Sequence, residues 1–270
     1  MNIWLNGAIV GASGAIDARD RGVTLGDGVF ETLAVIGGIP LRFERHAARL
    51  AFGAEALGIP LTYTRAALVD ALQSLCADIG MEEGSARITL LRGPAPRGIA
   101  PPSDPTPTVM ITAAVGPVGV AAPVRLIVAQ STRRNERSPL AAIKSANYLD
   151  AVIAMREAKA ARADDAILLN TRDMVCEATA ANVFCRFGDK LVTPPVSDGA
   201  LPGIMRACIM AAEAVTERTI SPNELRAADE VFLTSSLSVR PVIKIDGDII
   251  GNGQPGSAAT RLSDFPRRAE

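Results

Sequence analysis

Two stretches with apolar residues at helical spacing, each closed by a glycine, constrain the fold of this chain more than any other feature. The first runs over residues 44–57 and stops at Gly58, and the second runs over residues 65–79 and stops at Gly80. Both are predicted to be helices. The segments around them are β-rich and predict strands at residues 29–36, 86–91 and 108–115. Together they predict an α/β domain at the start of the chain.

Turn-forming residues complete this first domain. Asn6-Gly7 interrupts residues 4–10 and supplies the positive φ angles that a tight hairpin turn needs, so a hairpin is expected there. A second turn is expected at Gly37-Gly38, where the strand at 29–36 ends. Residues 92–107 are rich in glycine and proline and are expected to form an irregular loop.

A linker is predicted at residues 116–123, which are small, uncharged and turn-forming. It divides a domain at residues 1–115 from a second domain at residues 124–270. The second domain is expected to contain helices at 145–162 and 202–215. Its expected strands are 124–129, 166–170, 182–187, 190–193, 230–233 and 241–245.

The composition is that of an ordinary globular protein of 270 residues, with 48% hydrophobic and 21% charged residues and a net charge of −1. No basic excess would attract nucleic acid or an anionic membrane, so small-molecule partners are expected. The start of the chain has no basic flank followed by a long apolar core. No signal peptide is expected, and the predicted location is the cytoplasm.

Two features of the sequence could indicate a membrane protein or a metal-binding protein. The uncharged run 105–124 is about as long as a membrane helix, but its four prolines and two glycines argue against one. The four cysteines show no CxxC pair and no metal-ligand spacing. They are expected to be small buried hydrophobes, and no metal site is expected.

Lys144 is the first candidate for chemistry, because it lies between the polar loop 131–139 and the apolar helix expected from residue 145. A lysine that forms a Schiff base must spend part of its time as a neutral amine. A partly buried place beside other cations favours that form. A lysine at a helix start is also commonly a solvated surface residue, so Lys144 by itself leaves both interpretations open.

Glu177 is the second candidate, a carboxylate in the small, apolar surroundings of residues 175–184, just before an expected strand. A buried carboxylate needs a partner. The pyridine nitrogen of pyridoxal 5′-phosphate (PLP) is one, because an adjacent carboxylate keeps it protonated and lets the ring accept electrons from a substrate carbanion. An ion pair with an arginine is the alternative.

Three further segments offer groups that bind a phosphate. Residues 201–206 form a glycine-containing loop that turns into a helix, whose free N–H groups suit an anion. Thr234-Ser235-Ser236 adds hydroxyl donors at the end of a strand. Arg49, on the first helix, is an available arginine. Each of these signals is weak alone, since such loops, serines and arginines are common.

The order of these features resembles the class IV aminotransferases, the fold-type IV PLP family that includes D-amino-acid and branched-chain aminotransferases and 4-amino-4-deoxychorismate lyases. The resemblance spans nearly the whole chain, and several separated motifs in order are more specific than any one. The motifs are Asp20-Arg21-Gly22 with 26–32, His46 to Leu50, Ile143 to Tyr148, Glu177 to Phe184, Leu201 to Arg206 and Thr234 to Val242.

The resemblance implies an α+β fold with a small α/β N-terminal domain and a larger pseudo-barrel C-terminal domain. It implies that PLP lies between them, that the protein is a homodimer, and that the partner subunit lends part of the substrate pocket. Lys144 would then form the Schiff base and Glu177 would pair with the pyridine nitrogen. The implied remaining cofactor contacts are Arg49 and Ser235 on the phosphate, the backbone N–H groups of Ile204 and Met205, and Tyr148 on the ring hydroxyl. His46 is expected to orient local structure.

The resemblance implies transamination between an amino acid, either a D-amino acid or a branched-chain one, and a 2-oxo acid. A 4-amino-4-deoxychorismate lyase that releases p-aminobenzoate and pyruvate is the nearest alternative. A non-catalytic binding protein that kept the fold is an alternative of another class. The candidate substrate contacts are Thr32, Arg97, Thr234 and Ser236. Which of Arg87, Arg97, Arg133 and Arg137 binds the substrate carboxylate stays open, as does the stereochemical preference.

Overall fold

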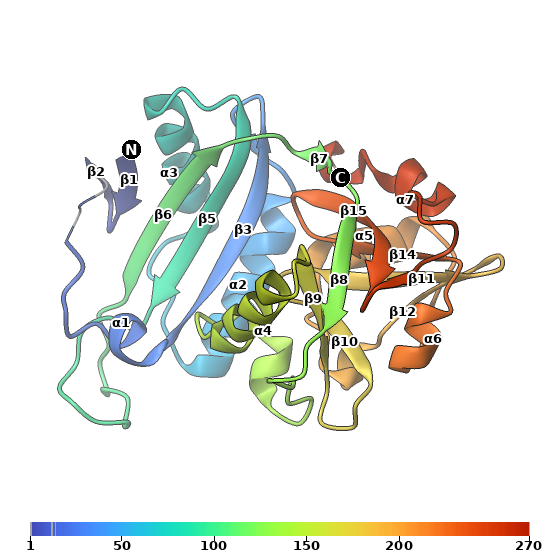
Figure 1. Cartoon of the computed structure of the whole chain (residues 1–270). Helices are drawn as coiled ribbons and strands as arrows, with labels where there is room; N and C mark the ends of the chain where they lie inside the picture. The colour runs from blue at the N-terminus through green and yellow to red at the C-terminus, as the bar shows by residue number, and fades with distance from the viewer. Residues whose placement is uncertain (1, 12, 14, 270) are drawn as a thin grey trace. The chain divides into compact units, whose positions relative to one another are not determined.

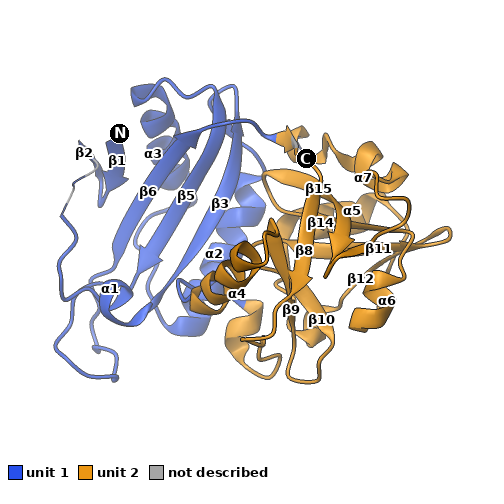
Figure 2. Cartoon of the chain, viewed as in Figure 1, with its two compact units in different colours: residues 1–118, 143–147, 269–270 blue, residues 119–142, 148–268 orange. Residues whose placement is uncertain are grey.

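The computed structural model describes residues 2–11, 13 and 15–269, which form two compact units (Figure 2). Unit 1 comprises residues 1–118, 143–147 and 269–270, and unit 2 comprises residues 119–142 and 148–268. The chain thus passes from unit 1 to unit 2 within the segment 116–123. It returns to unit 1 for the five residues around Lys144, a return that the sequence pattern did not indicate.

Unit 1 is built on an antiparallel sheet of six strands in the order β2-β1-β6-β5-β3-β4. The strands are β1 (Asn2–Leu5), β2 (Ala8–Gly11), β3 (Gly28–Ile36), β4 (Ile39–Pro40), β5 (Glu83–Leu91) and β6 (Thr108–Val115). The predicted hairpin is confirmed, with Asn6 and Gly7 at φ angles of 46° and 102° in its turn. The predicted strands at 29–36, 86–91 and 108–115 are also present.

Two helices, α2 (Phe43–Leu57) and α3 (Arg65–Asp78), lie on the same side of this sheet (Figure 1). As predicted, α2 ends at Gly58, which adopts the left-handed conformation with φ 63°. The side chain of Thr64 caps α3 by accepting a hydrogen bond from the N–H of Ala67. A short helix, α1 (Arg21–Leu25), was not predicted, because five residues carry too little periodicity.

The core of unit 1 lies between this sheet and the two helices. Strand side chains alternate between faces, so every second residue points into the core. The core-facing strand residues are Trp4, Val29, Leu33, Val35, Ala86, Ile88, Leu90, Val109, Ile111 and Ala113. The intervening residues, which include Phe30, Thr32 and Arg87, therefore belong to the opposite face of the sheet.

Unit 2 contains a ten-stranded mixed sheet whose main path is β10-β9-β8-β15-β14-β11-β12-β13, with β7 and β16 also paired to β15. The strands are β7 (Gly119–Val120), β8 (Val124–Val128), β9 (Asp165–Leu169), β10 (Val175–Ala178), β11 (Asn182–Phe187), β12 (Lys190–Thr193), β13 (Val215–Glu217), β14 (Glu230–Thr234), β15 (Ser238–Ile245) and β16 (Asp248–Ile249). The sheet curls, so that Ala178 at the end of β10 donates a 2.8 Å hydrogen bond to the carbonyl of Ala181, just before β11. This is the expected α+β fold with a pseudo-barrel second domain.

The helices of unit 2 are α4 (Leu149–Ala160), α5 (Ile204–Ala212), α6 (Pro222–Arg226) and α7 (Ser257–Leu262), with single turns η1 (Pro139–Ala142), η2 (Val196–Asp198) and η3 (Phe265–Arg267). Two predicted helix limits were wrong. The helix predicted from residue 145 begins at Leu149, because residues 144–146 form backbone hydrogen bonds with β3 instead. The helix predicted to reach residue 215 ends at Ala212, because Val215 pairs with Leu191 in a strand.

Among the described residues, no helix is long and apolar enough to cross a membrane. The segment 105–124 instead contains the strands β6 and β7. Of the four cysteines, Cys76, Cys176 and Cys185 are buried and Cys208 is partly buried, and all four carry free thiols.

Candidate active site

Lys144 is held against β3 by backbone hydrogen bonds within unit 1. The N–H of Phe30 donates to the carbonyl of Lys144 at 2.9 Å, and the N–H of Ala146 donates to the carbonyl of Gly28 at 2.8 Å. A side chain at Gly28 could not be accommodated, since its Cβ would lie 2.6 Å from the carbonyl oxygen of Leu90. The lysine thus sits on an extended segment attached to a sheet, a more rigid support than the helix start that we expected.

The amine of Lys144 lies over the ring of Phe30, with Nζ 4.4 Å from the ring centroid. The guanidinium of Arg87 lies over the same ring at 3.5 Å. The negative face of an aromatic ring attracts cations, so Phe30 holds both groups in one place. Sequence patterns alone did not single out Phe30, although it belongs to the motif at residues 26–32.

Arg49 belongs to a buried polar cluster between α2 and β3. Its Nε and Nη2 each donate a 2.7 Å hydrogen bond to the carboxylate of Glu31, and His46 Nδ1 lies 2.6 Å from Glu31 Oε2. The side chains of Glu31 and His46 are only 1% exposed, and that of Arg49 is 11% exposed. This cluster fixes the direction of the Arg49 guanidinium.

The charges of this cluster follow from its hydrogen bonds. Burial raises the pKa of Glu31, but the hydrogen bonds and charges of Arg49 and His46 outweigh burial and bring this pKa below its ordinary value. Burial lowers the pKa of His46, and the opposing effect of Glu31 is smaller. His46 is therefore neutral at pH 7 and donates its Nδ1–H to the Glu31 carboxylate. This geometry agrees with the expected orienting role of His46.

Glu177 lies in β10 of unit 2, within a strand and not before one as expected. Its Oε1 is 3.1 Å from Nε of Arg134, and its Oε2 accepts a 3.0 Å hydrogen bond from the N–H of Leu201. The carboxylate is therefore held from two sides in a residue that is 9% exposed. The alternative considered for Glu177, an ion pair with an arginine, is present. Arg134 had not been singled out.

The start of α5 is joined to Glu177 through Leu201. The side-chain amide of Asn182 donates a 2.9 Å hydrogen bond to the carbonyl of Leu201. A Cβ at Gly203 would lie 1.9 Å from the Asn182 Oδ1, so the backbone can approach this amide only at a glycine. Gly203 caps α5, and Ile204 and Met205 are its first two residues, both buried. Their N–H groups belong to the first turn, where a helix provides free donors.

Thr234 lies directly opposite Asn182 in the pairing of β11 with β14. It is 1% exposed, and its Oγ1 has no hydrogen-bond partner among the described residues. Ser235 follows it, and its Oγ accepts hydrogen bonds from the N–H groups of Leu237 (3.2 Å) and Ser238 (3.3 Å). Ser236 is partly buried in the same turn.

Unit 2 therefore brings together Glu177, Ile204, Met205, Thr234, Ser235 and Ser236 through Leu201 and Asn182. An unpartnered buried hydroxyl costs free energy unless a ligand pairs with it. A glycine-capped helix start beside it suits an anion. The residues present fit a phosphate-bearing cofactor.

The other predicted residues lie elsewhere. Thr32 is on β3, two residues after Phe30 and on the same face of the sheet. Tyr148 caps the N-terminus of α4 and is half-buried. Arg97 is exposed in the loop before β6, where it lines a pocket of about 440 Å³ with Arg19 and Arg21. Unit 1 thus places Thr32 on the strand that holds the Lys144 backbone, and it places Arg97 beside Arg19 and Arg21.

This fold, with a lysine fixed on the small unit and a carboxylate beside a helix start in the large one, defines the fold-type IV PLP-dependent enzymes. Comparison with known proteins gives the family. The class IV aminotransferase family matches residues 28–245, and the chain belongs to this family, whose members use PLP.

Two curated relatives cover almost the whole chain. A protein of Methanocaldococcus jannaschii, provisionally named as a branched-chain-amino-acid aminotransferase, is 31% identical over 98% of this chain and 94% of its own. The D-alanine aminotransferase of Bacillus licheniformis is 34% identical over 95% of this chain and 92% of its own.

Two solved structures show the same fold. A protein of Legionella pneumophila, provisionally named as a 4-amino-4-deoxychorismate lyase, has a TM-score of 0.84 and 32% identity and covers 94% of both chains. The T.th. branched-chain aminotransferase, in complex with N-(5′-phosphopyridoxyl)-L-glutamate, has a TM-score of 0.89 and 26% identity, with 98% of this chain and 92% of the other covered. The chain is an enzyme of the class IV aminotransferase family.

Proposed function

We propose that this enzyme is a transaminase that moves an amino group between an amino acid, either a D-amino acid or a branched-chain one, and a 2-oxo acid, with PLP held as a Schiff base on Lys144. The observation that carries this proposal is the family match over residues 28–245, which includes Lys144 and Glu177. The names of the two curated relatives support the two amino-acid classes. The proposed assembly is a cytoplasmic homodimer.

The proposed cofactor contacts follow from the geometry of each unit. Glu177, held in place by Arg134 and the N–H of Leu201, would face the pyridine nitrogen. Arg49, directed by Glu31, would bind the phosphate as a planar, permanently charged donor. The N–H groups of Ile204 and Met205 and the hydroxyl of Ser235 would complete the phosphate site, and Tyr148 would bind the ring hydroxyl.

The proposed chemistry of the chain centres on the Lys144 amine. When bound, PLP supplies an electron sink for negative charge at the substrate α-carbon. Lys144, once released by the incoming amino group, would remove the proton from that α-carbon. It would then deliver this proton to C4′, the cofactor carbon to which the nitrogen is transferred. Phe30 would keep the amine positioned during this transfer, and the attachment of residues 144–146 to β3 would limit its movement.

A lyase is the second candidate function, and the 32% identity to the Legionella pneumophila protein supports it. A panel of D-alanine, L-leucine and 4-amino-4-deoxychorismate, with pyruvate or 2-oxoglutarate as acceptor, separates the two. Transamination predicts reaction with at least one amino acid and little p-aminobenzoate. Rapid p-aminobenzoate formation with negligible reaction on the amino acids would replace transaminase by lyase. Binding of the compounds without turnover would support a non-catalytic protein.

The role of Lys144 is testable because the chain has only four lysines, at positions 144, 159, 190 and 244. The other three are exposed, whereas Lys144 is partly buried. Borohydride reduction of the holoenzyme, followed by digestion and mass spectrometry, is expected to find the cofactor mass on the Lys144 peptide alone. Lys144→Ala is expected to abolish the label, and Lys159→Ala is expected to retain it. A reducible label of equal yield in Lys144→Ala would overturn the assignment.

A further inference from the structure

The Glu177 carboxylate is held by two groups that come from different segments of unit 2. Nε of Arg134, in the loop between β8 and η1, lies 3.1 Å from its Oε1. The N–H of Leu201, between η2 and α5, donates a 3.0 Å hydrogen bond to its Oε2. Neither segment belongs to β10, the strand that carries Glu177. The position of this carboxylate therefore depends on what holds the two segments.

The segment that supplies Leu201 is anchored at Asp198, three residues earlier. The carbonyl of Asp198 accepts hydrogen bonds from Nδ2 of Asn170 (3.2 Å) and from the thiol of Cys176 (2.7 Å). Burial raises the pKa of this thiol, so it stays protonated and can donate. The Asp198 side chain is 3% exposed, and its Oδ1 pairs with Nη2 of Arg172. Among the described residues its Oδ2 has no hydrogen-bond partner, so the pairing of this buried carboxylate depends on Arg172.

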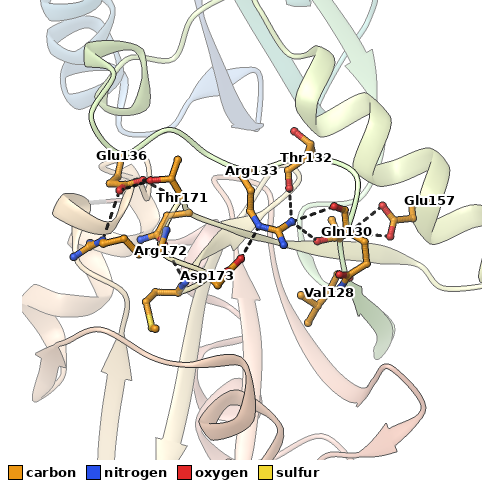
Figure 3. Close-up of polar contacts among 12 residues, drawn as sticks. Val128, Gln130, Thr132, Arg133, Glu136, Glu157, Thr171, Arg172 and Asp173 are labelled. Carbon is orange, nitrogen blue, oxygen red and sulfur yellow. Dashed lines mark hydrogen bonds and ion pairs between the residues drawn. The ribbon is translucent and has the colours of Figure 1, made fainter.

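The loop that supplies Arg134 is anchored at Glu136, two residues later. The Glu136 carboxylate accepts hydrogen bonds from the N–H (3.1 Å) and the hydroxyl (2.7 Å) of Thr171, and it lies 3.6 Å from Nε of Arg172 (Figure 3). The hydrogen bonds of Thr171 lower the pKa of Glu136, so this group is ionised at pH 7 and attracts the guanidinium. Its side chain is 6% exposed, which limits screening of that attraction by water.

Arg172 therefore joins the two segments across the turn between β9 and β10, with Nη2 on Asp198 and Nε on Glu136. An arginine suits this position because its planar guanidinium presents several donors in fixed directions. The Arg172 side chain is 53% exposed, and an arginine paired with exposed carboxylates would contribute little. Both of its partners are nearly buried, however. Without Arg172 the two segments would lose the side chain that links them.

We propose that Arg172 is a positioning residue for the cofactor. By linking the segments of Arg134 and Leu201, it keeps the Glu177 carboxylate where it meets the pyridine nitrogen. This inference rests on the proposed function, which places Glu177 at that nitrogen. A carboxylate beside the nitrogen favours its protonated form, and this form makes the ring a better electron acceptor. Arg172 thus acts on the chemistry through other residues.

The test uses the holoenzyme loaded with PLP that carries nitrogen-15 in its ring. The chemical shift of this nitrogen depends on its protonation and hydrogen bonding, which a loss of packing elsewhere does not change. Glu177→Gln gives the shift of a ring without its carboxylate partner. We expect Arg172→Gln to move the shift part of the way toward that value. The dissociation constant of PLP is expected to rise by about 2- to 30-fold, the range for residues that act through others.

Arg172→Lys is the conservative variant. It keeps the positive charge but has a single ammonium in place of the planar fork, so it is expected to recover part of the wild-type shift. It also supplies the measurement if the Arg172→Gln protein is too unstable to hold the cofactor. The melting temperature of each variant shows whether the folded protein is being compared.

Asp173→Asn is the matched control on the same turn. Asp173 pairs with Nε of Arg133 at 2.9 Å, and its side chain is 71% exposed (Figure 3). Its φ of 58° is a left-handed conformation that asparagine adopts readily. The substitution therefore breaks an ion pair of this turn without touching the link between the two segments, and it is expected to keep the wild-type shift.

The double variant Arg172→Gln with Glu177→Gln tests the route of the effect. It is expected to show the shift of Glu177→Gln alone, because Arg172 acts through that carboxylate. A wild-type shift in both Arg172→Gln and Arg172→Lys would overturn the proposal, and so would an equal change in Asp173→Asn. A wild-type shift in Glu177→Gln would instead overturn the placement of Glu177 at the cofactor, which belongs to the proposed function.

Discussion

Arg49 and Glu31 form a two-point ion pair in which both hydrogen bonds are 2.7 Å long and the carboxylate is 1% exposed. Two parallel bonds fix the plane of the guanidinium as well as its position. His46, on the same helix as Arg49, donates a third bond to this carboxylate. The proposed phosphate-binding arginine is thus directed by a residue on the strand that supports Lys144.

Replacing Glu31 by glutamine tests this arrangement. The substitution keeps the shape of the side chain but leaves the Arg49 charge buried without its counterion. Breaking a buried pair in this way costs about 3–5 kcal/mol of unfolding free energy. Urea unfolding of the apoprotein is expected to show that loss, and the affinity for PLP is expected to fall because Arg49 is no longer directed.

Glu44→Gln provides the comparison for this variant. Glu44 of α2 pairs with Arg65, the first residue of α3, and their side chains are 65% and 55% exposed. An exposed pair contributes about 0–1 kcal/mol, so this variant is expected to stay near the wild type. Equal effects of the two substitutions would contradict the directing role of Glu31.

The pH dependence of stability has a component that belongs to His46, the only histidine. Its pKa in the folded state is below the ordinary value of 6.5, because burial disfavours the charged form and the hydrogen bond of Glu31 only partly compensates. The unfolded chain therefore binds a proton below pH 6.5 that the folded chain does not bind. Stability falls as the pH drops below 6.5, by at most about 1.4 kcal/mol per pH unit for one group.

His46→Asn removes this component while keeping a side-chain N–H for Glu31. Its unfolding free energy is expected to change less than that of the wild type between about pH 7 and pH 5. The pKa of Glu31 is also lowered, so the contribution of Glu31 to folding stability is lost only below its ordinary value of 4.5. Glu31 therefore does not affect the comparison of the two proteins between pH 7 and pH 5. Identical slopes for both proteins would show that His46 does not titrate as described.

Much of the fold was predictable from local patterns. The Asn6-Gly7 turn and the glycine stops of α2 and α3 depend on backbone conformations that only a few residues adopt easily. The limits of α4 and α5 were not predictable. They depend on residues far apart in sequence, since residues 144–146 bond to β3 and Val215 pairs with Leu191. Helical periodicity contains no information about such partners.

The residues of the candidate site also fall into those that the sequence could indicate and those that it could not. Lys144, Glu177 and Arg49 could be proposed because their motifs occur in the order that resembles the class IV aminotransferases. Phe30 and Arg134 could not, because their significance comes from contacts across strands and loops. The sequence did contain a signal for Glu31, because Glu31 is the single carboxylate in the apolar run 28–36.

Gly203→Ala tests the close approach at the start of α5. The backbone of Gly203 has φ −70°, which suits alanine, so the main obstacle is the Asn182 Oδ1 at 1.9 Å from the new Cβ, with the Arg206 Cβ farther away at 3.3 Å. Asn182 must move and lose its bond to Leu201. Overpacking of this kind costs about 1–3 kcal/mol, and PLP affinity is expected to fall with it.

Two further variants test whether the clash with Asn182 causes the losses expected for Gly203→Ala. Gly116→Ala is expected to be neutral, because a Cβ there has nothing within 4 Å. Asn182→Ala combined with Gly203→Ala is expected to lose less than the sum of the single losses, since the clash is then absent. Strict additivity in melting experiments would show that the clash is not responsible.

Thr234 and Thr193 are both buried threonines, but we expect their replacement by valine to have opposite effects on the stability of the apoprotein. Thr193 Oγ1 donates a 2.7 Å hydrogen bond to the carbonyl of Val183, whereas Thr234 Oγ1 has no partner among the described residues. Thr193→Val is therefore expected to destabilise the apoprotein by about 1 kcal/mol. Thr234→Val removes an unsatisfied buried group and is expected to stabilise the apoprotein by about 1–3 kcal/mol.

If the Thr234 hydroxyl faces the bound ligand, the same variant must weaken binding of cofactor or carboxylate. Unfolding of both apoproteins and calorimetry of both holoenzymes would measure these effects, and a Thr234→Val protein destabilised like Thr193→Val would mean that the hydroxyl serves the fold alone.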